Sequence, residues 1–206
     1  MAKPELESLD AFVAFFQKKC NDNYLNVSAL EHALDNLCTI QDGWVAEFGV
    51  AGGRSLKTIR ARTPAHVPVM GFDCFTGLPE AWRPGYDKGE FSSQGKIPDI
   101  ADNCVVVKGI FSQTLPPLRP LLESRPARFI HVDCDLYSST VDVFTHCEKS
   151  IVAGTVLVFD ELLNYETFEQ HEIKAFYEFI LRTGHEFNII GIQCANSQPC
   201  AVVVTK

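Results

Sequence analysis

The sequence predicts an α/β fold in which a doubly wound, mostly parallel sheet of seven strands is covered by helices. Short, nearly continuous apolar runs alternate with helical segments from about residue 44 to residue 182, as in a sheet that is buried on both faces. Turn residues punctuate these segments, for example at Asp42, Gly43 and Gly154. The last two apolar runs, 187–192 and 201–204, have no helix between them, which predicts an antiparallel C-terminal strand.

Each expected strand is a short apolar run, and the seven runs are 44–48, 69–72, 104–107, 129–132, 156–159, 187–192 and 201–204. Apolar residues at helical spacing predict the connecting helices, at about 54–62, 118–124, 140–151 and 168–182. Two N-terminal helices are expected at about 6–16 and 27–37, and the pattern Ser28-x-x-Glu31 is typical of a capping box. We therefore expect an N-terminal helical cap over residues 1–40 and one globular domain over residues 41–206.

Charge and hydropathy argue against several classes of protein. The 206 residues carry a net charge of -8 without any basic run, which disfavours a general nucleic-acid binder. No stretch is apolar over the roughly 18 residues that a membrane span needs, and the first residues lack the apolar core of a secretory signal. The cysteines form no C-x-x-C pair, which disfavours a zinc ribbon or a thioredoxin-like motif. We expect a cytoplasmic protein whose partners include neither nucleic acid nor membrane.

A glycine-rich turn follows the first strand, in the run Glu47-Phe-Gly-Val-Ala-Gly-Gly-Arg-Ser55. Glycines let a ligand approach bare peptide groups, and the helix that opens at about Arg54 directs free N–H groups at that ligand. Asp73 follows the second strand, where a carboxylate can accept hydrogen bonds from both ribose hydroxyls. Because ligands bind beyond the carboxyl ends of parallel strands, the turn and the acid predict a ribose-bearing cofactor. A tight turn without a ligand, and an acid that only caps a loop, are the alternatives.

More acids follow the fourth and fifth strands. Asp133 and Asp135 come after the fourth strand and point to the same side if the strand continues through them. Asp160 and Glu161 come after the fifth strand. Like charges at one edge of a sheet repel unless a cation lies between them, and Mg²⁺ takes oxygen ligands of this kind. The sequence therefore predicts a Mg²⁺ site, with solvated loop acids as the alternative.

Five motifs occur in order between about residues 45 and 165: Glu47-Phe-Gly-Val-Ala-Gly-Gly-Arg-Ser55, Gly71-Phe-Asp-Cys-Phe-Thr-Gly-Leu-Pro79, Gly109-Ile-Phe-Ser-Gln-Thr-Leu-Pro116, His131-Val-Asp-Cys-Asp-Leu-Tyr-Ser-Ser139 and Gly154-Thr-Val-Leu-Val-Phe-Asp-Glu161. Together they resemble the macrocin O-methyltransferase family of class I S-adenosylmethionine-dependent methyltransferases, which have a Rossmann-like fold. Members of that family methylate sugar hydroxyls on macrolides and use S-adenosylmethionine and Mg²⁺.

The resemblance implies roles for individual residues. It implies that S-adenosylmethionine is bound by Glu47, Gly49, Val50, Ala51, Gly52, Ser55, Asp73, Cys74, Gly109, Ile110 and Asp133. In this set Asp73 is the ribose ligand, and Gly109 and Ile110 flank the adenine. The implied metal ligands are Asp133, Asp160 and Glu161. The family more often has Asp-Asp at the last pair, so Glu161 is a departure that shifts the geometry of the metal site.

The implied reaction is methyl transfer to a hydroxyl of a sugar or of another small diol metabolite. The protein must place the oxygen in line with the sulfonium methyl group and help to remove a proton, and Mg²⁺ on a vicinal diol would lower the pKa of a hydroxyl. The catalytic candidates are Asp133, Asp135 and His131, although a histidine in a strand is more often structural. The irregular segment 75–103, which carries Trp82, Tyr86 and Phe91, is expected either to close over the substrate as a lid or to be a surface loop.

Three rival interpretations remain at this point. A nicotinamide-dependent oxidoreductase would also use a glycine-rich turn and an acid, but the glycine spacing does not match G-x-G-x-x-G and the later acids have no role in hydride transfer. A non-catalytic module could keep the cofactor site, and a catechol-like diol could replace the sugar. The expected partner is a small-molecule acceptor, and the apolar N-terminal helix leaves a homo-oligomer open.

Overall fold

The computed structural model describes residues 6–19, 22–100, 102–193 and 198–206. The strands in these ranges form one sheet and are β1 (Tyr24–Leu25), β2 (Trp44–Phe48), β3 (Val69–Asp73), β4 (Cys104–Lys108), β5 (Ala127–Val132), β6 (Val156–Leu163), β7 (Phe187–Gln193) and β8 (Gln198–Val204). Their order across the sheet is β1-β7-β8-β6-β5-β2-β3-β4. Only β8 is antiparallel to its neighbours, β6 and β7, while the other described pairs are parallel. The predicted α/β class is confirmed, and the two-residue β1 adds an eighth strand to the seven expected.

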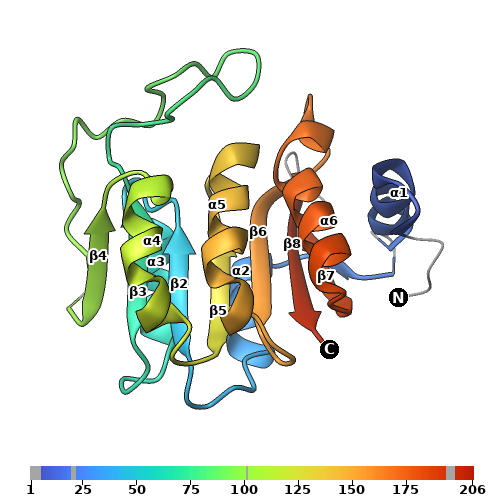
Figure 1. Cartoon of the computed structure of the whole chain (residues 1–206), viewed down its shortest axis with the longest axis horizontal. Coiled ribbons are helices and arrows are strands. Elements are labelled where there is room, and N and C mark those ends of the chain that lie inside the picture. The colour runs from blue at the N-terminus through green and yellow to red at the C-terminus, as the bar shows by residue number, and fades with distance from the viewer. Residues whose placement is uncertain (1–5, 20–21, 101, 194–197) are drawn as a thin grey trace.

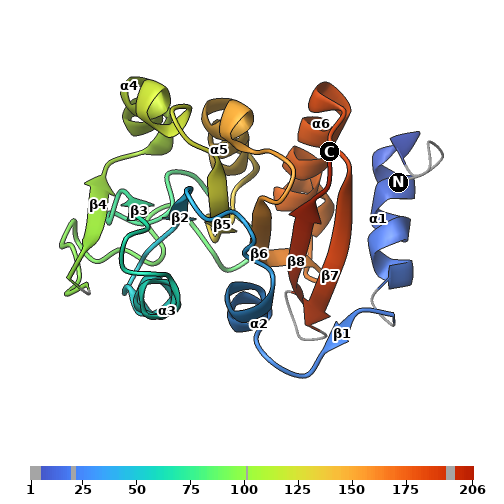
Figure 2. The same ribbon diagram turned by 90° about the horizontal axis from the view of Figure 1, so that it is seen from below.

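Helices cover both faces of the sheet, as Figure 2 shows. The described α-helices are α1 (Leu9–Lys19), α2 (Ala29–Asn36), α3 (Arg54–Arg62), α4 (Phe111–Leu122), α5 (Tyr137–Cys147) and α6 (Glu172–Thr183). In Figure 2 the helices α4, α5 and α6 lie on one face of the sheet, and α2 and α3 lie on the other. Two clusters of buried apolar side chains fill the space between the sheet and these two layers. Burial on both faces explains why the central strands are almost wholly apolar in sequence.

The N-terminal segment contributes to the sheet as well as to the helices. Residues Phe12 and Phe16 of α1 are fully buried, and their rings pack against Phe176 and Phe187. After α1 the chain forms β1, which pairs in parallel with β7. The Ser28 hydroxyl then accepts a hydrogen bond from the backbone N–H of Glu31, 3.3 Å away, as the capping-box pattern predicts.

Helix α4 is the described helix whose start the sequence pattern misplaces most; the starts of α1, α5 and α6 differ from the predicted positions by smaller amounts. It begins at Phe111, whereas the pattern predicts a start at about residue 118, and it contains Pro116, Pro117 and Pro120. Proline has no backbone N–H group to donate to a helical hydrogen bond, so several prolines close together predict a loop that ends before the helix begins. Burial of Phe111 and Leu115 against the sheet outweighs the missing hydrogen bonds.

The functional edge of the sheet is set by a reversal in the order of the strands. From β2 the chain moves outward through β3 and β4, and it then returns to place β5 on the other side of β2. The crevice beyond the carboxyl ends of β2 and β5 is the place where an open α/β sheet binds ligands. In Figure 1 the loop between β3 and β4 extends above this edge.

Candidate active site

The glycine-rich turn and the acid-bearing segment after β5 meet at this crevice. The backbone N–H of Asp133 donates to the carbonyl oxygen of Phe48 at 2.9 Å, and that of Gly49 donates to Phe72 at the same distance. Gly49 has a φ of 98°, and a Cβ atom there would overlap the carbonyl oxygen of Asp133. Only a glycine at position 49 lets the turn pack this closely against Asp133.

Asp73 closes the turn from the neighbouring strand. One of its carboxylate oxygens accepts the backbone N–H groups of Val50 and Ala51, both at 2.8 Å, and the other accepts the N–H of Phe75 at 2.6 Å. The two features that the sequence singles out for a ribose-bearing cofactor are therefore in direct contact.

A cavity of about 230 Å³ opens beside this contact. Its lining includes predicted site residues from β2 to β6 and the turns that follow them, namely Gly49, Ala51, Asp73, Cys74, Gly109, Ile110, Asp133, Asp135 and Glu161. Lining residues that the sequence analysis did not select are Gly77, Leu78, Pro79, Phe111, Cys134 and Ser139. These six residues lie in the motifs 71–79, 109–116 and 131–139 that carry the family resemblance, which is the signal that could have identified them. Phe91, which belongs to the segment expected as a lid or surface loop, lines the cavity as well. The remaining candidates do not line this cavity: Glu47, Val50, Gly52, Ser55, His131 and Asp160.

The three predicted metal ligands come together, and two of them, Asp133 and Glu161, line the cavity. One oxygen from each of Asp133, Asp160 and Glu161 can be chosen so that all three lie within 4.8 Å of one another. Burial raises the pKa of Asp133 well above its usual value, and the charge of Asp160 raises it further, although His131 opposes the shift. Such crowding of acids is the setting in which a hard divalent cation binds.

Asp135 reaches the same group of acids by a different route from the one expected. Strand β5 ends at Val132, and Asp135 adopts a φ of 63°, so the strand does not continue through it. Its side chain still lines the cavity with Glu161. Burial raises the pKa of Asp135 to about 6, and burial together with the charge of Asp135 raises the pKa of Glu161 to about 11.

His131 lies close to Asp160 and is hydrogen-bonded to Glu47. Its Nδ1 atom is 2.8 Å from Oε1 of Glu47, and both side chains are buried. Its Nε2 atom is 3.9 Å from Oδ1 of Asp160. Burial lowers the pKa of His131, but the hydrogen bond to Glu47 and the charge of Asp133 outweigh it and raise the pKa to about 9.

Comparison with known proteins identifies the kind of enzyme that this geometry belongs to. A family model described as a methyltransferase domain matches residues 46–162, which is more than half of the 206 residues. The chain belongs to this methyltransferase family. It therefore carries an S-adenosylmethionine-dependent methyltransferase domain, and the match spans both the glycine-rich turn and the acids.

Solved structures with this fold include two methyltransferases. CalS11, a calicheamicin methyltransferase, has a TM-score of 0.61 and 21% identity over 97% of this chain and 78% of its own. The O-methyltransferase NovP has a TM-score of 0.58 and 19% identity over 86% of this chain and 77% of its own. No curated protein matches the chain. None of the helices in the described ranges is long and apolar enough to cross a membrane.

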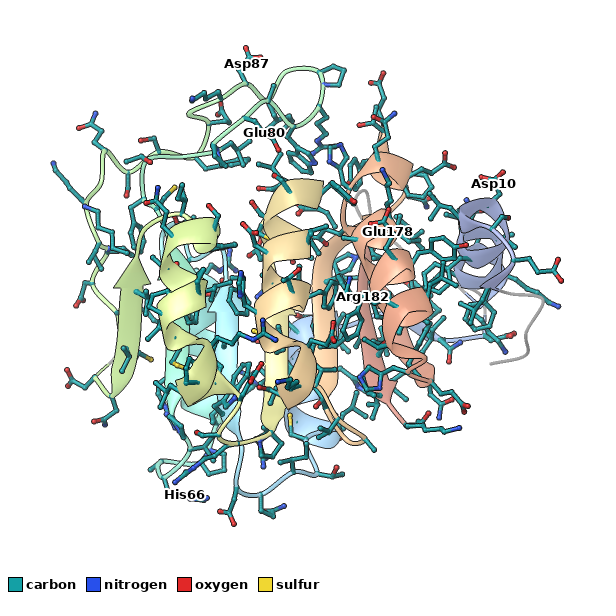
Figure 3. The ribbon with its side chains drawn as sticks, viewed as in Figure 1. Asp10, His66, Glu80, Asp87, Glu178 and Arg182 are labelled. Carbon is teal, nitrogen blue, oxygen red and sulfur yellow. The ribbon has the colours of Figure 1, made fainter. Side chains whose placement is uncertain are left out.

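Aromatic residues of the loop between β3 and β4 hold this loop against the rest of the domain. Trp82 is 6% exposed and packs with Leu78 and Leu136. The guanidinium group of Arg83 lies 4.1 Å from the centre of the Trp82 ring. Glu80 accepts a hydrogen bond of 2.5 Å from the hydroxyl of Ser138 at the start of α5. In Figure 3 this loop, with Glu80 and Asp87 labelled, lies above the carboxyl ends of the strands, and His66 lies at the opposite end of the molecule.

The aromatic residues of this loop differ in their exposure. Trp82 is buried, whereas Phe91 lines the cavity and is 49% exposed. Buried polar groups that the sequence analysis did not select lie next to this region, including Tyr165, His171 and Glu172. Glu172 opens α6 and is fully buried, and no periodicity distinguishes it from the exposed acids of other helices.

Proposed function

We propose that the protein is an O-methyltransferase that transfers the methyl group of S-adenosylmethionine to a hydroxyl of a sugar or of another small diol, assisted by Mg²⁺. The observation that carries this proposal is one cavity lined both by the glycine-rich turn with Asp73 and by the acids Asp133, Asp135 and Glu161. The resemblance to the macrocin O-methyltransferase family supports it. CalS11, whose fold is similar, is described as a TDP-rhamnose 3'-O-methyltransferase.

The cofactor would occupy the half of the cavity near the glycine-rich turn. Asp73 is placed to accept hydrogen bonds from the ribose hydroxyls, and Gly109 and Ile110 line the wall where the adenine would lie. Gly49 and Ala51 offer bare backbone to the rest of the cofactor. A methyl donor held there would face the acids across the same cavity.

The acids suit a divalent cation. Asp133, Asp160 and Glu161 offer carboxylate oxygens within 4.8 Å of one another, and Oε2 of Glu161 is buried without a hydrogen-bond partner among the described residues. A cation bound by them would lower the pKa of a hydroxyl on a vicinal diol and fix its orientation. Removal of a neighbouring acid would weaken this effect, because the acids supply the negative charge that retains the cation.

Asp135 is the residue best placed to take the proton. It lines the cavity, whereas His131 is 1% exposed and does not. Bound S-adenosylmethionine would supply the methyl group, so that a C–O bond replaces the S–CH₃ bond, and the Asp135 carboxylate would take the hydroxyl proton of the acceptor. S-adenosylhomocysteine and the methyl ether are the products, so atoms and charge balance.

The test is methyl transfer by the purified protein to a panel of sugars, nucleotide sugars and catechols, with formation of S-adenosylhomocysteine as the measurement. We expect turnover with at least one diol in the presence of Mg²⁺, and a fall of about 100-fold or more in Asp135→Asn because a general base is lost. The affinity of Asp135→Asn for S-adenosylhomocysteine, measured by calorimetry, should stay within a few-fold of that of the unchanged protein.

Asp87→Asn is the matched control, because Asp87 is an exposed acid of the loop that points away from the sheet in Figure 3. It should turn over normally. Tight binding of S-adenosylhomocysteine with no turnover on any diol would favour the non-catalytic module instead. Stabilisation by NAD but not by S-adenosylhomocysteine would contradict the proposal altogether. The cytoplasmic location and the homo-oligomer stay predictions from the sequence.

A further inference from the structure

We propose that His131 is a nitrogen ligand of the divalent cation, that Glu47 orients it, and that the site therefore binds Mn²⁺ more tightly than Mg²⁺. This inference rests on the metal site of the proposed function and changes its ligand set and metal preference. It adds an imidazole to a site that the sequence motifs describe by carboxylates alone. It also gives Glu47 a role that differs from the cofactor contact implied by the family resemblance.

The hydrogen bond to Glu47 fixes which nitrogen of His131 can bind a cation. Oε1 of Glu47 lies 2.8 Å from Nδ1 of His131, and both side chains are buried. A carboxylate accepts hydrogen bonds, so Nδ1 carries a hydrogen. A cation that displaces the proton from Nε2 would therefore bind through the lone pair of that nitrogen. Metal-binding histidines are held in this way, with one nitrogen donating to a carboxylate and the other facing the metal.

The free nitrogen of His131 is directed at the acids. Nε2 is buried and has no hydrogen-bond partner among the described residues. It lies 3.9 Å from Oδ1 of Asp160, which is too long for a hydrogen bond. Atoms that share one metal ion, each about 2.0–2.2 Å from it, lie roughly 3–4 Å apart. The separation therefore fits two ligands of the same ion.

Asp133 links the histidine to the three-acid group. Ligand atoms of Glu47, His131 and Asp133 can be chosen within 4.8 Å of one another, as can those of Asp133, Asp160 and Glu161. Asp133 belongs to both sets. Among the described residues, no single set within 4.8 Å holds His131 together with Asp160 and Glu161, so the centre lies at Asp133, the residue common to both sets. A cation there would draw in His131 and the neighbouring acids, while Glu47 remains behind the imidazole as its hydrogen-bond acceptor.

The nitrogen ligand determines the metal preference. Carboxylate and water ligands suit Mg²⁺, whereas imidazole favours the first-row transition metals. Mn²⁺ accepts both kinds of ligand and, unlike Zn²⁺, has little tendency to bind the cysteine side chains of this protein. It is therefore the probe that separates a His-containing site from a site of oxygen ligands.

The experiment uses the whole protein, freed of metal with a chelator and titrated with Mn²⁺ alone and with Mg²⁺ alone. Calorimetry gives both affinities, and pulsed electron paramagnetic resonance detects nitrogen coupled to bound Mn²⁺. We expect Mn²⁺ to bind about tenfold or more tightly than Mg²⁺, with an imidazole nitrogen signal. His131→Gln should remove that signal and most of the preference for Mn²⁺. Glu47→Gln should weaken Mn²⁺ binding by about 10-fold or more.

His146→Gln is the matched control, because His146 belongs to α5 and to neither group of candidate ligands. It should behave as the unchanged protein does. Bound Mn²⁺ without nitrogen coupling, equal affinities for the two ions, or no saturable binding of Mn²⁺ would each overturn the inference. The first two readouts use the unchanged protein, so misfolding of a variant cannot hide the answer. If S-adenosylhomocysteine binds and diols are methylated while these results are negative, only the inference fails and the proposed function stands.

Discussion

The two halves of the cavity are built by different physical means. In the half near the glycine-rich turn, the polar groups have partners: Asp73 accepts three backbone N–H groups, from Val50, Ala51 and Phe75. The shape of that half comes from backbone packed on backbone, since Gly49 leaves no room for a side chain beside Asp133. Steric fit and satisfied hydrogen bonds hold this half in place before any ligand arrives.

In the half that carries the acids, buried carboxyl groups lack the hydrogen-bond partners that would compensate for their burial. A buried oxygen of Glu161, which lines this half, has no hydrogen-bond partner among the described residues, and the same holds for buried oxygens of Glu47 and Glu172 outside the cavity lining. The pKa values of Glu161 and Glu172 are raised, first by burial and then by neighbouring carboxylates. Buried polar groups are normally paired, and unpaired ones destabilise the fold. The comparison indicates that one half contributes stability and the other costs stability, a cost that the proposed cation would offset on binding.

The largest expected effect is a loss of stability when Gly49 is replaced by alanine. The new Cβ would overlap a backbone carbonyl, and the φ of 98° is strained for any residue with a side chain. We expect Gly49→Ala to lower the free energy of unfolding by about 4 kcal/mol or more, which is a large part of the stability of a typical domain. Urea denaturation, or the yield of soluble protein, measures the loss.

Gly52→Ala is the matched control within the same turn. A Cβ atom there would have open space around it, and Gly52 is not among the described residues with positive φ. Its effect on the free energy of unfolding should stay within about 1 kcal/mol. Equal losses in the two variants would show that backbone packing does not hold this half of the cavity.

The next effect has the opposite sign and concerns Glu172. This carboxyl is fully buried, and the acids facing it include Asp133, Asp135 and Asp160, so its pKa lies well above the usual 4.5. A carboxyl whose pKa is raised in the folded state contributes stability at low pH and loses it as pH rises above 4.5. Glu172→Gln keeps the shape without the titration, so we expect it to stabilise the metal-free protein by about 1–3 kcal/mol at pH 7 and by less at pH 5.

Thermal or urea unfolding at the two pH values measures this gain. Glu169→Gln serves as the control, because Glu169 is an exposed acid just before α6. Its effect on the free energy of unfolding should be below about 0.5 kcal/mol at both pH values. A Glu172→Gln variant that is less stable than the unchanged protein, or a gain that is larger at pH 5, would refute the view that the acids cost stability.

The same contrast explains what the sequence reveals. The order and type of the strands follow from apolar runs, because burial on both faces leaves a plain local signal, and β2 and α3 begin and end where the pattern predicts. The start of α4 does not, because proline is a local signal for a loop while burial of Phe111 is a tertiary effect. Strand β1 has only two residues and depends on its pairing with β7, which no local pattern shows.

The site divides in a similar way. Motifs at strand ends correctly place Gly49 beside Asp73 and bring Asp133, Asp160 and Glu161 together, since the topology fixes where strand ends lie. Contacts between side chains are harder to predict from the sequence. The hydrogen bond between Glu47 and His131 joins residues 84 positions apart, and the apolar pattern of neither strand indicates this contact. Glu172 lies at the start of a helix, where an acid is also common on the surface, so burial alone distinguishes it.

The smallest expected effect tests whether Asp73 serves the fold as well as its proposed role as a cofactor ligand. Asn in its place keeps one acceptor oxygen but loses the negative charge, and it directs an amide donor at backbone N–H groups. We expect Asp73→Asn to lower the free energy of unfolding by about 1–2 kcal/mol, because charge-assisted hydrogen bonds to Val50, Ala51 and Phe75 are weakened. The affinity for S-adenosylhomocysteine, measured by calorimetry, should fall about 10-fold or more. If the variant keeps its stability but binds S-adenosylhomocysteine more weakly, Asp73 acts on the cofactor alone. The half near the glycine-rich turn would then be less preorganised than its hydrogen bonds indicate.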